Sequence, residues 1–138
     1  MSGSSREESV AELELTAHWE GGYRMRTEVR GLEIRADEPP EYRGDNTGPM
    51  PTELFLASLA SCFGMAVVHA GRKRGIDLPD VAVKVTGTYE GLRFARIRVE
   101  VVSSHPREAL EPLLERAVSY CYVSNTLLHQ PLMEFVIA

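Results

Sequence analysis

A long apolar segment in the middle of the chain constrains the fold most strongly. Residues 54–70 are apolar except for Ser58, Ser61 and His69. The segment is slightly short for a membrane span, and a helix buried inside a protein explains it better. Because it is apolar on nearly all sides, we expect it to be the buried central element of the domain or of a dimer.

Residues at both ends of this segment set the limits of a helix. Pro51 suits the first helical position, where its missing N–H costs nothing. The basic residues 72–74 complement the helix dipole, and Gly75 suits the residue that ends a helix. The sequence therefore predicts a helix from Pro51 to about Arg74.

Alternating apolar and polar residues predict strands before and after this helix. Gly21-Gly22 and Glu90-Gly91 indicate hairpin turns, and the polar residues 37–50 form a long loop. The expected strands are residues 11–19, 23–30, 32–36, 81–89 and 94–102. The short apolar segment at residues 133–138 is expected to be a closing strand.

A second helix is expected after His105-Pro106. Its apolar residues repeat at helical spacing up to Cys121, which places Cys121 on the buried face. Pro112 interrupts the pattern, so it either kinks the helix or marks its true start. The order of elements predicts an α+β fold, with helices packed on antiparallel sheets.

Length and charge narrow the functional classes. Residues 11–138 are expected to form one domain, after a disordered polar lead-in at residues 1–10. The net charge of −5 argues against nucleic acid and membrane surfaces as partners. The polar lead-in has no apolar core of a signal peptide, so the expected compartment is the cytoplasm, where thiols stay reduced.

Cys62 and Cys121 are the chain's two thiols, each in an apolar helical segment. A thiolate attacked by a peroxide becomes a sulfenic acid, and a second thiol can condense with it to a disulfide. Buried cysteines also occur as inert packing residues. The pattern alone leaves both interpretations open.

The segments that carry the thiols resemble a known family. Residues 48–67 (GPMPTELFLASLASCFGMAV) combine a Pro-x-Glu-Leu start with an Ala-x-Cys-Phe sequence at its centre, here Ala60 to Phe63 with Ser61 between. Residues 120–126 (YCYVSNT) resemble a second motif, Cys-Pro-x-Ser-Asn. Together they resemble the OsmC/Ohr family, the osmotically inducible and organic hydroperoxide resistance proteins, in a divergent OsmC-like branch.

The resemblance implies a thiol-dependent peroxidase for organic hydroperoxides that acts in oxidative stress defence. It implies that Cys62 attacks the peroxide and Cys121 resolves it. It also implies an intertwined homodimer with the active site at the subunit interface, no bound cofactor or metal, and an external dithiol reductant of the lipoyl type. The apolar side chains of Phe55, Leu59, Phe63 and Met65 are candidates for a substrate pocket or for plain core.

Two departures concern residues near the thiols. Tyr122 stands where the family has proline, and Thr52 stands where characterised members have a catalytic glutamate. The neighbouring acid is Glu53, which on an ideal helix lies about 13 Å along the axis from Cys62 and on the opposite side. Glu53 is therefore a candidate catalytic acid or a first-turn acid that stabilises the helix dipole.

A third departure concerns the arginine that activates the thiolate in the family. Arg24, Arg26 and Arg43 are candidates, and no motif selects among them. His69 lies about 10 Å along the helix from Cys62, too far to share a zinc ion. These departures keep an alternative open, a non-catalytic OsmC-like protein that binds a small molecule or senses redox state under stress.

Overall fold

The structure is a computed structural model that describes residues 11–138. The disordered lead-in expected at residues 1–10 lies outside the described residues. The chain divides into two compact units, the first up to Pro51 and the second from Thr52 onward. The prediction of a single domain over residues 11–138 stays a prediction, and each unit is described by itself.

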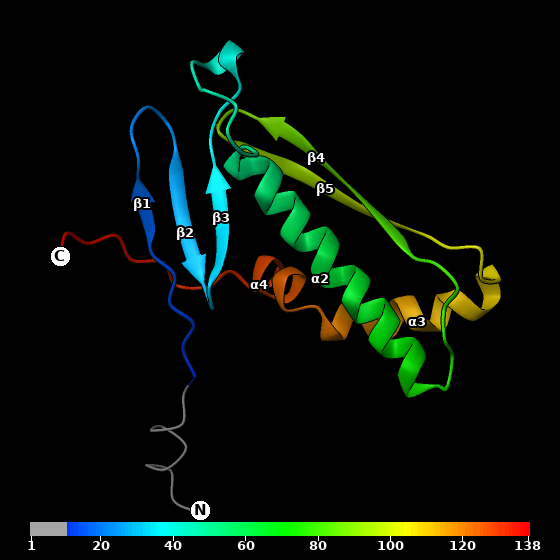
Figure 1. Ribbon diagram of the computed structural model, residues 1–138. Coiled ribbons are helices and arrows are strands. Elements are labelled where there is room, and N and C mark those ends of the chain that lie inside the picture. The colour runs from blue at the N-terminus through cyan, green and yellow to red at the C-terminus, as the bar shows by residue number, and fades with distance from the viewer. Residues whose placement is uncertain (1–10) are drawn as a thin grey trace, which may run out of the picture. The chain divides into compact units, whose positions relative to one another are not determined.

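The first unit is an antiparallel sheet of three strands, β1 (Ala17–Trp19), β2 (Met25–Val29) and β3 (Leu32–Ala36), in the order β1-β2-β3 (Figure 1). The predicted Gly21-Gly22 turn is confirmed, and both glycines have positive φ. β1 is shorter than expected because residues 11–16 form no regular structure. Leu13 and Leu15 are exposed, so the alternating apolar and polar residues there bury no apolar face.

The loop after β3 is ordered around one buried carboxylate. Asp37 is only 1% exposed. It accepts hydrogen bonds from the main-chain N–H groups of Glu38, Asp45 and Thr47 and from the Thr47 hydroxyl. Hydrogen bonds from the Thr47 N–H and hydroxyl outweigh desolvation and hold the pKa of Asp37 below its ordinary value. A short 3-10 helix, η1 (Pro40–Tyr42), lies inside this loop.

The second unit is built on α2 (Pro51–Lys73), which confirms the predicted helix. Gly75 follows it with φ 71°, as expected of a glycine after a helix. By length and composition alone α2 is apolar enough to cross a membrane, a test that core helices of soluble proteins also pass. In the single chain only one face is buried, formed by Leu59, Phe63, Ala66, Val67, Ala70 and Gly71.

A long hairpin packs on this helix. β4 (Ala82–Glu90) pairs antiparallel with β5 (Arg93–Val102), from Ala82 opposite Val102 to Glu90 opposite Arg93. Alternate valines and isoleucine of the hairpin pack against the buried face of α2. Phe94 stacks on Phe55 of α2 with ring centroids 6.1 Å apart. Gly87 leaves room for Phe94, because a Cβ there would lie 2.7 Å from the ring.

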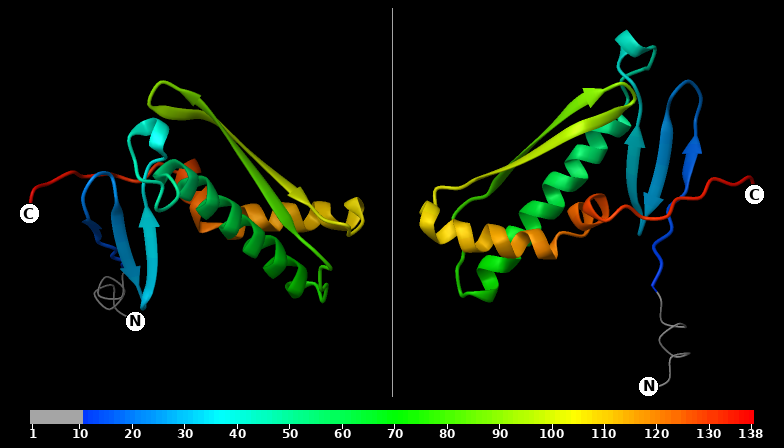
Figure 2. Two further views of the ribbon diagram at one scale, coloured as in Figure 1. Left: turned by 45° about the horizontal axis from the view of Figure 1, so that its top comes forward. Right: turned by 180° about the vertical axis from the view of Figure 1, so that it is seen from behind.

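Two further helices complete the unit, α3 (Arg107–Tyr120) and α4 (Tyr122–Leu128). Figure 2 shows α3 crossing α2, and Leu113 of α3 is fully buried. Pro112 lies inside α3, which continues through it. The antiparallel sheets and the long central helix confirm the predicted fold class, while α4 was not predicted.

The closing strand expected at residues 133–138 is wrong. This segment has no regular structure, and Phe135 and Ile137 are 87% and 100% exposed. A strand needs a neighbour for its main-chain N–H and C=O groups, and within residues 11–138 no strand pairs with this segment.

Candidate functional site

Packing of α2 against the junction of α3 and α4 brings the two thiols together. Cys121 is fully buried in a cluster with Leu59, Phe63 and Ala117. Cys62 packs against the same cluster but remains partly exposed. The sequence left open whether the two cysteine-bearing segments meet, and the tertiary structure brings them into one core.

The backbone holds Cys121 between two helices. Its N–H donates to Ala117 of α3, which closes that helix, and its extended conformation (φ −81°, ψ 106°) makes it the residue before α4. Its Sγ accepts a hydrogen bond from the Ser124 N–H at 3.4 Å. The Ser124 hydroxyl donates to the Cys121 carbonyl at 3.3 Å. The buried sulfur therefore has a fixed position and a defined polar partner.

These contacts alter the acidity of the buried thiol. Burial acts to raise the pKa of Cys121, whereas hydrogen bonds from Ser124 and from the Cys62 thiol lower it, and the lowering prevails. Cys62 contributes to this shift because it packs against the core cluster that contains Cys121. Cys121 thus ionises more readily than an ordinary thiol despite its burial.

Cys62 faces a cavity of about 550 Å³, whereas Cys121 lies behind it in the core. The cavity is mainly apolar, with a few polar groups from α3 and α4 at its wall. It is lined by Cys62, Met65, Ala66, His69, Ser119, Tyr120, Tyr122 and Asn125. A small molecule in this cavity therefore meets the sulfur of Cys62 first.

Polar and aromatic contacts shape the cavity wall. The rings of His69 and Tyr120 meet edge to face with centroids 5.0 Å apart. The side-chain amide of Asn125 donates to the Ser119 carbonyl at 3.1 Å, which ties α4 to α3. Tyr122, the residue in the place of the family's proline, is 84% exposed and lines the cavity.

Sequence reasoning gave no role to several of these residues. The sequence marks His69 only as a zinc ligand too distant from Cys62, and within residues 11–138 no cluster of three metal-ligating side chains occurs. Ser124 appeared only as part of a motif, although its spacing three residues after Cys121 is that of a capping partner. Asn125 and Tyr120 gave no pattern that marks a cavity wall.

The remaining predicted site residues of α2 lie in different surroundings. Glu53 is exposed in the first turn and does not line the cavity around Cys62, so its catalytic role stays a prediction. Leu59 and Phe63 belong to the core, while Met65 is 72% exposed and lines the cavity.

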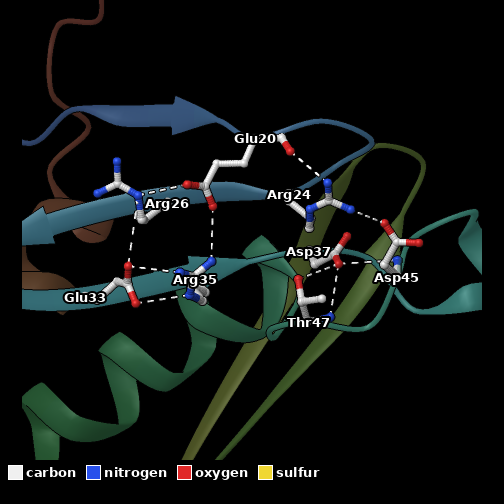
Figure 3. A network of polar contacts seen from close by, with 8 residues as sticks. All are labelled: Glu20, Arg24, Arg26, Glu33, Arg35, Asp37, Asp45 and Thr47. Carbon is white, nitrogen blue, oxygen red and sulfur yellow. Dashed lines mark hydrogen bonds and ion pairs between the residues drawn. The ribbon is translucent and has the colours of Figure 1, made fainter.

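Two of the three candidate arginines, Arg24 and Arg26, contact carboxylates of the first unit (Figure 3). Arg24 pairs with Asp45, and Arg26 donates to Glu20 at 3.0 Å. The hydrogen bond from Arg26 is the main cause of the lowered pKa of Glu20. Arg43 follows η1 with φ 69°. The choice among the three as thiolate activator stays a prediction.

A second cavity of about 570 Å³ lies in the same unit, and neither cysteine lines it. Its walls are apolar apart from Arg96 and Ser124. The lining residues are Leu59, Phe63, Phe94, Ala95, Arg96, Ile97, Val99, Leu114, Val118, Ser124, Leu127 and Leu128.

The chain is similar to one protein family and to several solved structures. The family model described as OsmC-like protein matches residues 44–135. No curated protein matches the chain. Among solved structures, an OsmC like protein from Mycoplasma pneumoniae is 19% identical with a TM-score of 0.69, and the match covers 87% of this chain and 89% of that one.

Two further solved structures are organic hydroperoxide resistance proteins. The one from Legionella pneumophila is 24% identical with a TM-score of 0.62, over 86% of this chain and 91% of that one. The one from Elizabethkingia anophelis is 22% identical with a TM-score of 0.62, over 87% and 91% of the two chains. At these identities the likeness establishes the fold.

Proposed function

This chain belongs to the OsmC-like protein family, and we propose that it is a cytoplasmic, thiol-dependent peroxidase that reduces organic hydroperoxides in oxidative stress defence. The observation that carries the proposal is the pairing of the two thiols. Cys62 faces a cavity, and it packs against the core cluster in which Cys121 is fully buried. Two of the similar structures are organic hydroperoxide resistance proteins, which supports the choice of substrate class.

The proposed oxidation uses the two thiols in turn. The Cys62 thiolate attacks one oxygen of the peroxide, so that an S–O bond forms, the O–O bond breaks and the alkoxide leaves as an alcohol after taking a proton. Cys62 is then a sulfenic acid. The Cys121 thiolate attacks Cys62 Sγ, the S–S bond forms as the S–O bond breaks, and the oxygen leaves as hydroxide, which takes a proton to become water. An external dithiol of the lipoyl type then reduces the Cys62–Cys121 disulfide and restores both thiols.

The cavity supports an organic rather than an inorganic peroxide. Apolar side chains of Met65, Ala66 and Tyr120 surround the approach to Cys62. An alkyl or acyl group gains burial there, whereas hydrogen peroxide gains none. The Cys121 contacts support the resolving role, because a thiol that ionises readily is a thiolate for more of the time.

Exposed apolar surface supports the proposed intertwined homodimer. In the single chain α2 is buried on one face only. Several apolar side chains of the C-terminal segment are almost fully exposed, namely Leu132, Phe135, Val136 and Ile137. A partner copy that pairs with this segment would bury both surfaces. A monomer by light scattering at micromolar concentration would contradict this part of the proposal.

The test is a single-turnover oxidation of reduced protein. Stoichiometric cumene hydroperoxide is expected to consume both thiols with a mass loss of about 2 Da, faster than hydrogen peroxide does. Cys62→Ser is expected to abolish the reaction. Ser58→Ala, one turn earlier on α2, is the matched control and should react like the natural protein. Full turnover by Cys62→Ser would overturn the mechanism.

The second cavity favours one other candidate function, the binding of an apolar small molecule with the cysteines as packing residues. Its wall is apolar apart from Arg96 and Ser124, and it contains neither thiol. This function predicts an apolar ligand retained from the expression host, visible by native mass spectrometry, and slow alkylation of Cys62. Rapid alkylation of Cys62 with no retained ligand would reject it.

A further inference from the structure

The cavity beside Cys62 differs from the second cavity in the kind of side chain that forms its wall. Much of its wall consists of the rings of His69, Tyr120 and Tyr122 and the thioether of Met65. Within residues 11–138, which the structure describes, no leucine, isoleucine or valine lines it. The second cavity, by contrast, is lined mostly by branched aliphatic side chains. The two cavities of this unit therefore suit ligands of different chemistry.

We propose that the cavity beside Cys62 selects hydroperoxides that carry an aromatic group, and that Tyr122 is a specificity-determining residue for them. The inference rests on the peroxidase function proposed above and adds the class of substrate. The peroxide oxygens of the bound substrate lie at Cys62 on the α2 side of the cavity. Its aromatic ring lies against the opposite wall, which Tyr120 of α3 and Tyr122 of α4 contribute.

An aromatic ligand gains more from such a wall than an aliphatic ligand of the same size. Aromatic rings attract one another in offset-stacked and edge-to-face arrangements, beyond the gain from the buried area alone. The sulfur of a methionine such as Met65 also makes favourable contacts with an aromatic ring. A saturated ring buries a similar area but lacks the π-system that both contacts need. The aromatic character of the ligand, rather than its size, therefore decides the preference.

Part of the aromatic wall is held in place before a ligand binds. The rings of His69 and Tyr120 meet edge to face, and Tyr120 packs against the core cluster behind it. The hydrogen bond from the Asn125 amide to the Ser119 carbonyl ties α4 to α3 at the same wall. Binding therefore orders few side chains, which lowers its entropic cost.

Tyr122 offers the ring that a ligand can reach most easily. It is 84% exposed and lines the cavity. Among the aromatic residues that the structure describes, none has a ring in contact with that of Tyr122. Its backbone is fixed as the first residue of α4. The proline that the family has at this position offers no aromatic ring, so the preference belongs to this chain.

The first experiment measures binding without peroxide chemistry. Reduced protein is alkylated with iodoacetamide, and modification of Cys62 is followed by peptide mass spectrometry. Cumyl alcohol, the alcohol that cumene hydroperoxide forms on reduction, competes in one series, and its ring-hydrogenated cyclohexyl analogue competes in the other. We expect cumyl alcohol to protect Cys62 at an about fivefold lower concentration. Equal protection by the two alcohols would overturn the inference.

The second experiment tests Tyr122 with the same pair of alcohols. Tyr122→Leu keeps an apolar side chain but removes the ring, so the preference should fall from about fivefold to about twofold. Tyr122→Phe keeps the ring and should keep the preference. The matched control is Tyr89→Leu, which replaces another exposed tyrosine of the same unit that does not line the cavity. An equal preference in Tyr122→Leu and Tyr89→Leu would refute the role of Tyr122.

The third experiment looks for the same preference in the oxidation itself. Reduced protein reacts in a single turnover with cumene hydroperoxide or with its cyclohexyl analogue, each at a concentration well below saturation, and loss of thiols is followed. We expect a faster reaction with cumene hydroperoxide, and a smaller ratio of the two rates in Tyr122→Leu than in Tyr89→Leu. Equal ratios in these two variants would contradict a role of Tyr122 in selecting the substrate.

The outcomes separate this inference from the proposed function. If cumyl alcohol protects Cys62 better but neither hydroperoxide oxidises the thiols, the peroxidase proposal fails and the aromatic site stands. If both hydroperoxides react at equal rates and the two alcohols protect equally, the inference fails alone. If neither alcohol protects Cys62 and neither hydroperoxide oxidises it, both fail.

Discussion

Substitutions at Cys121 test whether this residue has a structural role separate from its chemistry. Cys121 is fully buried, and its Sγ accepts the Ser124 N–H at the start of α4. Replacement by alanine removes one buried heavy atom and the hydrogen-bond acceptor. Replacement by serine keeps an acceptor of the type preferred at the start of helices.

The structure sets the expected changes in the free energy of unfolding for the two substitutions. For Cys121→Ala we expect a loss of about 1 kcal/mol for the missing buried atom and about 1 kcal/mol for the missing cap, so the free energy of unfolding should fall by roughly 2 kcal/mol. Cys121→Ser keeps the hydrogen bond with Ser124 but buries a more polar atom. We expect it to cost about 1 kcal/mol or less.

The assay is urea unfolding of the reduced proteins at neutral pH, followed by circular dichroism. The same Cys121→Ser protein is then treated with organic hydroperoxide, where Cys62 should gain about 16 Da and, with excess peroxide, about 32 Da instead of forming a disulfide. If Cys121→Ser is less stable than Cys121→Ala by more than about 1 kcal/mol, the capping argument is wrong.

Three further predictions concern the two units separately. The lowered pKa of Asp37 stabilises the fold at pH values above the ordinary pKa, and this stability should be lost as the pH falls through the lowered value; Asp37→Asn should remove that dependence in urea titrations across acidic pH. Gly44→Ala should destabilise the first unit, because its Cβ would collide with the main chain of Glu38; unchanged amide-exchange protection of the loop would count against this. Leu113→Ala, at a fully buried site of α3, should cost about 2–5 kcal/mol in urea unfolding, and a cost below about 1 kcal/mol would mean that the site is not packed as described.

Local chemistry explains why much of the fold was predictable. The bounds of α2 follow from Pro51 at its start and Gly75 after its end, and both act within one turn of the chain. The hairpin turns depend on Gly21, Gly22 and Gly91 in the same local way, because each has positive φ.

Predictions failed where a distant partner decides the structure. Residues 133–138 are short and apolar like a strand, but a strand forms only where another backbone supplies hydrogen bonds. Residues 122–128 carry few helical signals, and α4 depends on a cap supplied by Cys121 and on the bond from Asn125 to Ser119. Neither arrangement is visible in composition or periodicity.

The same division holds for the candidate site. The sequence by itself determined which residues are thiols, that each lies in an apolar helical segment, and which family the two motifs resemble. The helical spacing also placed Cys121 on a buried face, as the structure has it. Only the tertiary structure decided that Cys62 lies at a cavity and that the Cys121 sulfur has the Ser124 N–H as its partner. Burial and access depend on the packing of α2 against α3, α4 and the hairpin, and such packing joins residues that are far apart along the chain.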